Sequence, residues 1–238
     1  MSVAYNSSIV SDSLVLCLDA ANAKSYPGSG TTWTDMSGSL NHGTLVNTPT
    51  YNANGTFGFD YTQTEYVSFA NTNSLMFLNL NQYTLESWIY PTIDPGPSNW
   101  TGVFNRESTD VGAVRDGYNM FIVQTGGTNI YFSTERFAGG TTVSASETVA
   151  NTSVLNIWHH VVSTFDGANV RFYRNGVLKS TSATTSNNIT NNIQTLQVGQ
   201  RGGQYFRGLI SNCRIYKRAL TNEEILKNFN AIRGRFGI

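Results

Sequence analysis

The chain has 238 residues, of which 13% are charged, well below the ~25% of an ordinary soluble protein. Its 15 Lys and Arg residues balance its 15 Asp and Glu residues, so it lacks the basic surface that nucleic acids or anionic membranes attract. Composition therefore argues against nucleic acid and membrane surfaces as partners.

Short runs of apolar or alternating residues, separated by Gly, Asn, Asp or Pro, recur every ~8–12 residues along the chain. This spacing is typical of an all-β, antiparallel, two-sheet sandwich and not of alternating strands and helices. The predicted strands lie at 14–18, 57–60, 66–69, 83–91, 102–105, 119–124, 129–133, 158–165, 170–173, 195–198 and 210–216. The proline-containing segment 91–100 predicts an exposed loop, and the polar segment 180–192 predicts a loop or an edge.

One hairpin and one helix are specified locally. Asn175-Gly176 follows a β-rich run and favours a type I′ turn. Thr221 and Glu224 have the spacing of a capping box, which predicts a helix over 221–232, and Gly234 is a plausible stop. We expect this helix to pack on the sandwich and cover an edge.

Domain organisation follows from the lack of any linker or charge run. The sequence predicts an N-terminal tail at 1–13, one sandwich domain at 14–232 and a C-terminal tail at 233–238. The first residues lack the basic and apolar regions of a signal peptide, so we expect a chain that is made without export.

Segment 157–178, IWHHVVSTFDGANVRFYRNGVL, resembles a signature of the laminin G-like, concanavalin A-like jelly-roll family. Further segments at 14–45, 57–91 and 208–225 are similar to other strands of that family in the same order. The resemblance implies a jelly roll. It does not fix the function, because this fold supports lectins, adhesins, hydrolases, lyases and viral modules.

Catalytic patterns are weak. Glu86 is the one carboxylate on its strand. Glu107 follows Arg106 and Glu135 precedes Arg136, so we expect these two glutamates to form exposed ion pairs with the adjacent arginines. His159 and His160 are adjacent strand residues that face opposite ways, one into the core and the other partly exposed, so they cannot share a metal. We expect a protein that is not an enzyme, with glycan hydrolysis or lysis as an alternative.

Calcium is the expected small ligand, because many relatives hold this ion among loop oxygens. The candidate ligands here are Asp19, Asp35, Asn41 and Asn212. The alternative is that Asp35 and Asn41 only cap turns through hydrogen bonds to the backbone.

Aromatic residues in loops are candidates for sugar contact. Trp100, between Asn99 and Thr101, is the best of them, and Asn99, Tyr118 and Tyr205 are the further candidates for ligand contact. The alternative for Trp100 is a loop anchored on its own sheet. By contrast, Trp33, Trp88 and Trp158 match core positions of the family.

Cys17 and Cys213 lie in the predicted first and last strands. The resemblance implies that these strands are neighbours, which leaves both a disulfide and two buried thiols open.

Segments 16–38 and 228–238 resemble laminin G-like modules of structural proteins in tailed bacteriophages. This resemblance implies a virion protein, a capsid decoration or tail-associated module. Such a protein would contact other virion proteins and further copies of itself through its tails and edge loops, and host glycans through its distal loops. A free-standing lectin or adhesin is the alternative.

Overall fold

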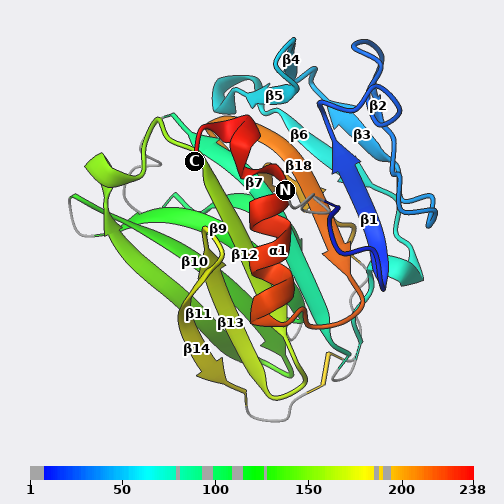
Figure 1. Ribbon diagram of the computed structural model, residues 1–238. Helices are drawn as coiled ribbons and strands as arrows, with labels where there is room; N and C mark the ends of the chain where they lie inside the picture. The colour runs from blue at the N-terminus through cyan, green and yellow to red at the C-terminus, as the bar shows by residue number, and fades with distance from the viewer. Residues whose placement is uncertain are drawn as a thin grey trace, which may run out of the picture.

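The computed structural model describes residues 8–78, 81–92, 99–108, 115–125, 128–184, 188–189 and 194–238. They form two antiparallel sheets packed face to face, with one α-helix lying across the outside of the first sheet (Figure 1). The predicted all-β sandwich is confirmed. No helix among the described residues has the length and apolar character needed to cross a membrane.

The first sheet, sheet A, has eight strands in the order β14-β13-β12-β7-β18-β5-β4, with β1 also pairing to β18. Its strands are β1 (Leu14–Asp19), β4 (Thr50–Asn52), β5 (Thr56–Phe59), β7 (Tyr83–Pro91), β12 (His159–Phe165), β13 (Asn169–Arg174), β14 (Val177–Ala183) and β18 (Gly208–Tyr216). The turn between β13 and β14 is the predicted one, because Asn175 and Gly176 both have positive φ angles, 53° and 75°.

The second sheet, sheet B, has eight strands in the order β11-β10-β9-β8-β15-β6-β3-β2. They are β2 (Thr32–Trp33), β3 (Gly43–Val46), β6 (Tyr66–Phe69), β8 (Thr101–Glu107), β9 (Gly117–Thr125), β10 (Asn129–Ala138), β11 (Thr141–Ala150) and β15 (Gln197–Val198). A small hairpin of β16 (Gln200–Arg201) and β17 (Gln204–Tyr205) follows β15. Short 3-10 helices are η1 (Tyr61–Gln63), η2 (Asn73–Leu75), η3 (Asn151–Ser153) and η4 (Arg233–Phe236).

The main core lies between the sheets, where alternate residues of each strand meet. Trp33 and Trp88 are both fully buried, as predicted, although Trp88 faces out from sheet A beneath the helix. His159 and His160 do face opposite ways, but both are buried, so the expectation that one is partly exposed is wrong. The ring of His160 is covered by Phe229 of the helix.

Helix α1 (Asn222–Ile232) begins as predicted, with the Thr221 hydroxyl accepting from the Glu224 amide and the Glu224 side chain accepting in return. The α-helix ends at Ile232, as predicted. Gly234, however, does not have the left-handed conformation of a stop, because the chain continues into η4, whose C-cap is Gly237 with a φ of 70°. The reason is that Phe236 stacks on Trp88 at a ring distance of 4.1 Å, which holds the extra turn on the sheet.

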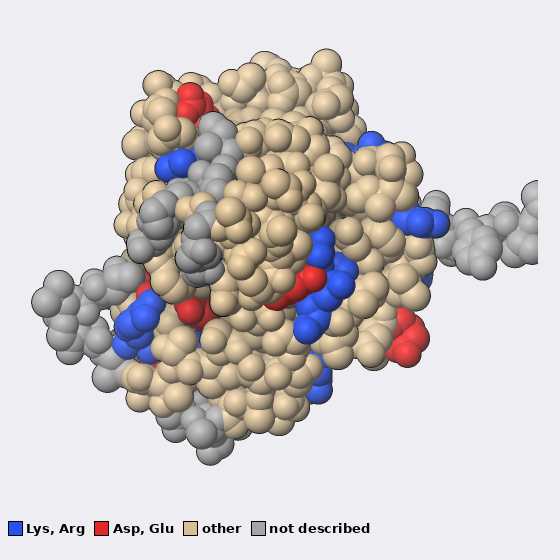
Figure 2. All heavy atoms as spheres, turned by 90° about the vertical axis from the view of Figure 1, so that its left-hand side faces the viewer, with Lys and Arg blue, Asp and Glu red and all other residues tan. Residues whose placement is uncertain are grey.

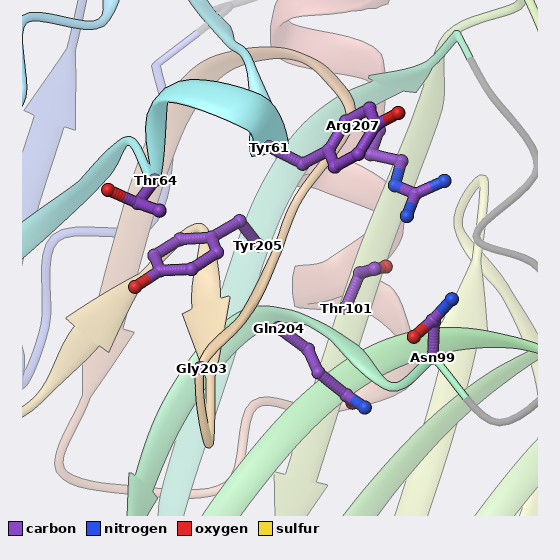
Figure 3. A pocket seen from close by; sticks show the side chains of 8 residues that line it. All are labelled: Tyr61, Thr64, Asn99, Thr101, Gly203, Gln204, Tyr205 and Arg207. Carbon is purple, nitrogen blue, oxygen red and sulfur yellow. The ribbon is translucent and has the colours of Figure 1, made fainter.

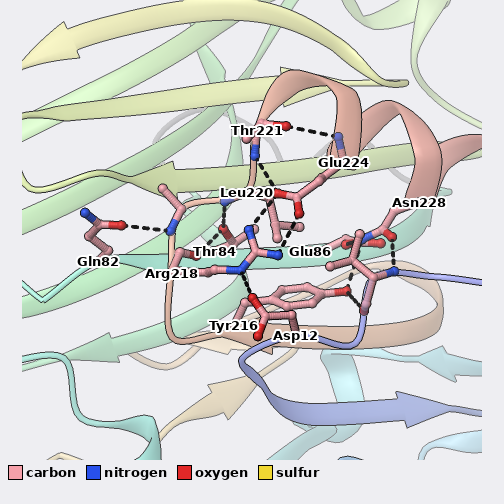
Figure 4. Close-up of polar contacts among 12 residues, drawn as sticks. Asp12, Gln82, Thr84, Glu86, Tyr216, Arg218, Leu220, Thr221, Glu224 and Asn228 are labelled. Atoms are coloured by element: carbon pink, nitrogen blue, oxygen red, sulfur yellow. Dashed lines mark hydrogen bonds and ion pairs between the residues drawn. The ribbon is translucent and has the colours of Figure 1, made fainter.

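A buried ion pair within sheet A, between Glu86 and Arg214, is linked to α1 through Asn228, and Figure 4 shows Asn228 beside Glu86. Glu86 of β7 accepts from Arg214 of β18 at 2.7 Å and from Asn228 of α1 at 2.6 Å. His160 of β12 lies 3.2 Å from the same carboxylate. Burial alone would raise the pKa of Glu86, but Arg214 and the other partners outweigh burial and lower it to about 2.

Both segments that the sequence analysis described as tails lie against the domain within the described residues. Val10 is buried, and its amide donates to Asn228 at 2.8 Å. At the other end, Arg235 donates to both carboxylate oxygens of Asp19, while Phe236 packs on Trp88. Residues 8–13 and 233–236 are therefore part of the folded unit.

The two cysteines occupy neighbouring strands, because Leu18 of β1 is directly opposite Cys213 of β18. Cys17 is opposite Arg214, so the two sulfurs point to opposite faces of sheet A. Both are free thiols, and burial raises the pKa of each, that of Cys213 to about 12. The prediction that the first and last strands are neighbours is confirmed. Cys17 and Cys213 are two buried thiols and not a disulfide.

Replacing Arg214 by Met leaves the Glu86 carboxylate buried without its main partner. We expect the free energy of unfolding at pH 7 to fall by about 3–5 kcal/mol. Because folding lowers the Glu86 pKa from 4.5 to about 2, this stabilisation is complete above pH 4.5 and is lost as the pH falls toward 2. Urea unfolding at several pH values in this range measures the loss. The control is Arg171→Met, which breaks the partly exposed ion pair between Arg171 and Asp166 and should lower the free energy of unfolding by under about 1 kcal/mol. Equal losses of unfolding free energy in the two variants would contradict the role of Arg214 as the main partner of the buried Glu86 carboxylate.

Candidate binding site

The β16–β17 hairpin is built by two glycines. Gly202 and Gly203 form its turn with φ angles of 55° and 80°, the left-handed region that a type I′ turn requires. Its base is held by Phe206, whose amide donates to Gly199 at 2.8 Å and whose ring is buried against Phe59. The hairpin is thus anchored at the edge of the core.

The hairpin lies on the outer face of sheet B. Arg201 donates from Nε to Glu107 at 3.1 Å and from Nη2 to Glu135 at 3.3 Å, and these two carboxylates belong to β8 and β10. Gly102 of β8 allows the approach, because a Cβ there would lie 2.4 Å from the Gln200 carbonyl oxygen. An ionic contact and a close backbone contact therefore fix the hairpin against the sheet.

We call Glu107, Arg115, Asn119, Glu135 and Arg201 the Glu107–Glu135 cluster. The Asn119 amide donates to both carboxylates, at 3.1 and 3.2 Å, and Arg115 donates to Glu107. Burial raises the pKa of Glu135, Arg201 partly offsets that rise, and the Glu107 charge adds to it. Each carboxylate is thus occupied by a guanidinium and an amide from the chain itself.

The expectation of exposed pairs with the adjacent arginines is wrong. Consecutive strand residues face opposite ways, so Arg106 and Arg136 point inward while Glu107 and Glu135 point outward. Arg136 lies over the Phe165 ring at 4.4 Å, inside the sandwich. The glutamates take their partners from the hairpin and from Arg115 instead.

A pocket of about 240 Å³ opens beside the hairpin, and we call it the hairpin pocket (Figure 3). Its walls come from η1 and the residues after it, the start of β8, and the hairpin. The lining residues are Tyr61, Thr64, Asn99, Thr101, Gly203, Gln204, Tyr205 and Arg207. The Arg207 guanidinium lies 3.8 Å from the Tyr61 ring centroid, on the opposite side of the pocket from Asn99 and Gln204 (Figure 3).

Trp100 adjoins this pocket and is 36% exposed. Its amide donates to the Gln204 side chain at 2.6 Å, its ring meets Phe121 at 5.0 Å, and the Arg201 guanidinium lies 5.0 Å from the ring centroid. Trp100 is therefore anchored on its own sheet and also partly exposed, and its contact with a sugar stays a prediction.

The structure brings three of the four predicted sugar-contact residues together. Asn99 and Tyr205 line the hairpin pocket, and Trp100 lies next to it. Tyr118 does not belong with them, because it lies on β9 facing the core and its hydroxyl donates to the Leu75 carbonyl at 2.8 Å. Its position in the sequence, close to loop residues, gave no sign of this inward orientation.

The four predicted calcium ligands form two separate pairs. Asp35 and Asn41 cap their loop, since the Asp35 carboxylate accepts from the backbone of Cys17, Ser37 and Asn41. The Asn41 side chain donates to Val15 at 2.7 Å. Turn capping is therefore present at Asp35, whereas the Asn41 side chain bonds to a carbonyl of β1 instead of its own turn.

Asp19 and Asn212 are directly opposite each other on β1 and β18. The Asp19 carboxylate, however, is bound by the Arg235 guanidinium, which already supplies a positive charge. Among the described residues no group of three or more His, Cys, Asp or Glu side chains is placed to hold a metal ion. The donors present do not fit a calcium site, and calcium binding stays a prediction.

The hydrolase alternative depended on a carboxylate that substrate can reach. Glu86 lies under α1 with no exposed surface. His159 is buried and its Nε2 donates to the Val154 carbonyl at 2.9 Å, and burial lowers its pKa to about 4, so it is neutral at pH 7. Neither residue is in a position to exchange protons with a bound sugar.

Figure 2 shows one face of the molecule, on which Lys, Arg, Asp and Glu atoms form small groups separated by wide uncharged surface.

Sequence reasoning missed Tyr61, Gln204 and Arg207. One signal was present, because Gly202-Gly203 between short polar flanks is a hairpin pattern. Nothing local indicates that this hairpin lies beside η1, a segment about 140 residues earlier in the chain.

The fold is that of a lectin-like jelly roll. Residues 61–226 match the laminin G family model described as Concanavalin A-like lectin/glucanases superfamily, and the chain belongs to this family. All eight residues of the hairpin pocket fall within the matched part. No curated protein matches the chain.

Similar solved structures are toxin binding domains. The binding domain of Paraclostridial Mosquitocidal Protein 1 has a TM-score of 0.68 at 16% identity, over 93% of this chain and 52% of that one. The binding domain of botulinum neurotoxin DC in complex with SialylT has a TM-score of 0.66 at 15% identity, over 93% and 52%. The same toxin domain in complex with rat synaptotagmin II has a TM-score of 0.67 at 16% identity, over 94% of this chain and 52% of that one. The chain therefore spans about half of each, and the likeness concerns the fold.

Substituting Gly102 by Ala should push the hairpin off sheet B, because the new Cβ would overlap the Gln200 carbonyl. We expect the free energy of unfolding to fall by about 1–3 kcal/mol in urea titrations. Gly234→Ala is the control, since no atom lies within 4 Å of a Cβ there. A Gly102→Ala protein as stable as the control would show that the hairpin is not packed as described.

Proposed function

We propose that this chain is a carbohydrate-binding module and that the hairpin pocket with Trp100 is its binding site. The observation that carries the proposal is Trp100, 36% exposed, beside a pocket lined by two tyrosines and two amide side chains. Aromatic rings pack on the apolar faces of sugars, and amides bond to their hydroxyl groups.

The geometry supports binding more than catalysis. Both carboxylates of the Glu107–Glu135 cluster are bound by Arg201 and Asn119, so neither is poised to protonate a glycosidic oxygen. The similar toxin structures are binding domains, one of them in complex with SialylT, and this supports the class of function without locating a site.

Replacing Trp100 or Tyr205 by Ala should weaken binding to whichever glycan the wild-type protein selects on an array, by about tenfold or more in titration calorimetry. Val177→Ala, which removes an exposed apolar side chain from the edge strand β14 of sheet A, serves as the control and should bind normally. A wild-type protein that binds no glycan, or variants that bind as tightly as wild type, would refute the proposal.

A virion is the setting that we propose for this binding, on the resemblance of segments 16–38 and 228–238 to tailed-bacteriophage modules. Residues 8–13 and 233–236 pack on their own domain, so they are not extended arms. Contacts with capsid or tail proteins, or with further copies of the chain, would then use edge strands and loops.

This setting can be checked by mass spectrometry of purified particles from cultures that carry the gene. We expect the chain at a fixed ratio to the major capsid or tail protein. Recovery only in the particle-free supernatant would contradict the virion role and leave a free lectin.

A further inference from the structure

We infer that Asp19, Asn212 and Trp88 on the outer face of sheet A form a second site for neutral sugars, which residues 233–238 cover in this structure. We call these three residues the covered row and residues 233–238 the C-terminal turn. The site is separate from the hairpin pocket, whose hairpin lies on sheet B.

The covered row crosses three neighbouring strands. Asn212 of β18 is directly opposite Asp19 of β1 on one side and Trp88 of β7 on the other. Directly opposite residues of a sheet point to the same face, so a carboxylate, an amide and a tryptophan ring stand in a row. This combination suits a sugar, because the ring packs on the apolar face of a pyranose while the amide and the carboxylate bond to its hydroxyl groups.

The Asn212 amide is the observation that points to a ligand. The residue has no exposed surface, and among the described residues neither its Oδ1 nor its Nδ2 has a hydrogen-bond partner. Trp88 Nε1 is likewise buried and unpaired within the described part of the chain. Buried polar groups are almost always hydrogen-bonded, and an unpaired one destabilises the state that buries it. Hydroxyl groups of a sugar in contact with Asn212 would remove this destabilisation.

The C-terminal turn occupies the position that we assign to the sugar. Phe236 packs on two tryptophans, with ring distances of 4.1 Å to Trp88 and 4.6 Å to Trp158. Arg235 donates to both carboxylate oxygens of Asp19, at 3.1 and 2.9 Å. The phenyl ring thus takes the place of an apolar sugar face, and the guanidinium takes the place of sugar hydroxyl groups.

The C-terminal turn is held separately from helix α1. Among the described residues, the hydrogen bonds that join residues 234–238 to sheet A come from the Arg235 side chain, which is 30% exposed. Partly exposed ion pairs of this kind contribute little to stability. Helix α1 is held by its own contacts, Asn228 on Glu86 and the buried Phe229. Because η4 continues beyond α1 across the same face of sheet A (Figure 1), its departure would uncover the row while the helix stays docked.

The test opens the turn in a protein whose hairpin pocket is disabled by Trp100→Ala and Tyr205→Ala. Adding Arg235→Ala and Phe236→Ala removes both contacts with the covered row. The matched control adds Ile238→Ala instead, which removes an exposed side chain of the same segment. An array of neutral oligosaccharides, including lactose, cellotetraose and maltotetraose, identifies the ligand, and titration calorimetry measures its affinity. We expect the opened protein to bind this ligand about tenfold or more tightly than the control protein.

Asn212→Leu distinguishes a binding site from simple packing. In the opened protein it should abolish the gained binding, because the amide that meets the sugar is lost. In the otherwise wild-type protein it should leave the melting temperature unchanged or higher, since leucine buries no unpaired polar group. This second measurement needs no open state, so it decides the inference even where the opened protein does not fold.

Three results would each overturn the inference. They are a folded opened protein that gains no binding, a gain that survives Asn212→Leu, and a lower melting temperature of the Asn212→Leu protein. Each leaves the hairpin pocket standing, because the test of that pocket uses Trp100 and Tyr205 variants in which the C-terminal turn is intact. Thermal melts of every variant establish which of them are folded.

Discussion

The buried Glu86 carboxylate is the constraint on which the outer half of the molecule depends. Its partners come from β18, β12 and α1, so a charge within sheet A is satisfied only when the C-terminal helix is docked. Removing any partner leaves a charge in a medium of low polarity, which costs far more than the pair contributes when complete. The same network draws in residues 8–13, because Val10 bonds to Asn228 and to the Tyr216 hydroxyl.

Closure of sheet A by the helix decides where binding can occur. Trp88 and His160 lie beneath Phe229 and Phe236, so the outer face of that sheet offers no exposed aromatic platform there. On the outer face of sheet B, Glu107 and Glu135 accept hydrogen bonds from Arg201 of the short β16–β17 hairpin. This hairpin covers a small area and leaves a pocket along its side. The helix covers the middle of the outer face of sheet A, and the hairpin covers only a small part of the outer face of sheet B.

Local signals in the sequence were enough for the sandwich, the Asn175-Gly176 hairpin and the capping box at Thr221, because each depends on neighbouring residues. Strand β11 was missed, since its Thr- and Ser-rich sequence lacks a clear apolar alternation at the edge of sheet B. Part of β14 was read as loop or edge for the same reason, and it is an edge strand.

The site could be predicted only in part, because its geometry depends on contacts across long stretches of chain. Trp100, Asn99 and Tyr205 were identified from residue type, but their meeting with Arg207 and Tyr61 follows from how the hairpin is fixed on β8. This division has a physical consequence for specificity. The groups that would touch a ligand lie on loops and a hairpin, while the core that positions them lies between the sheets, so the pocket can change its chemistry through a few side chains without loss of the sandwich.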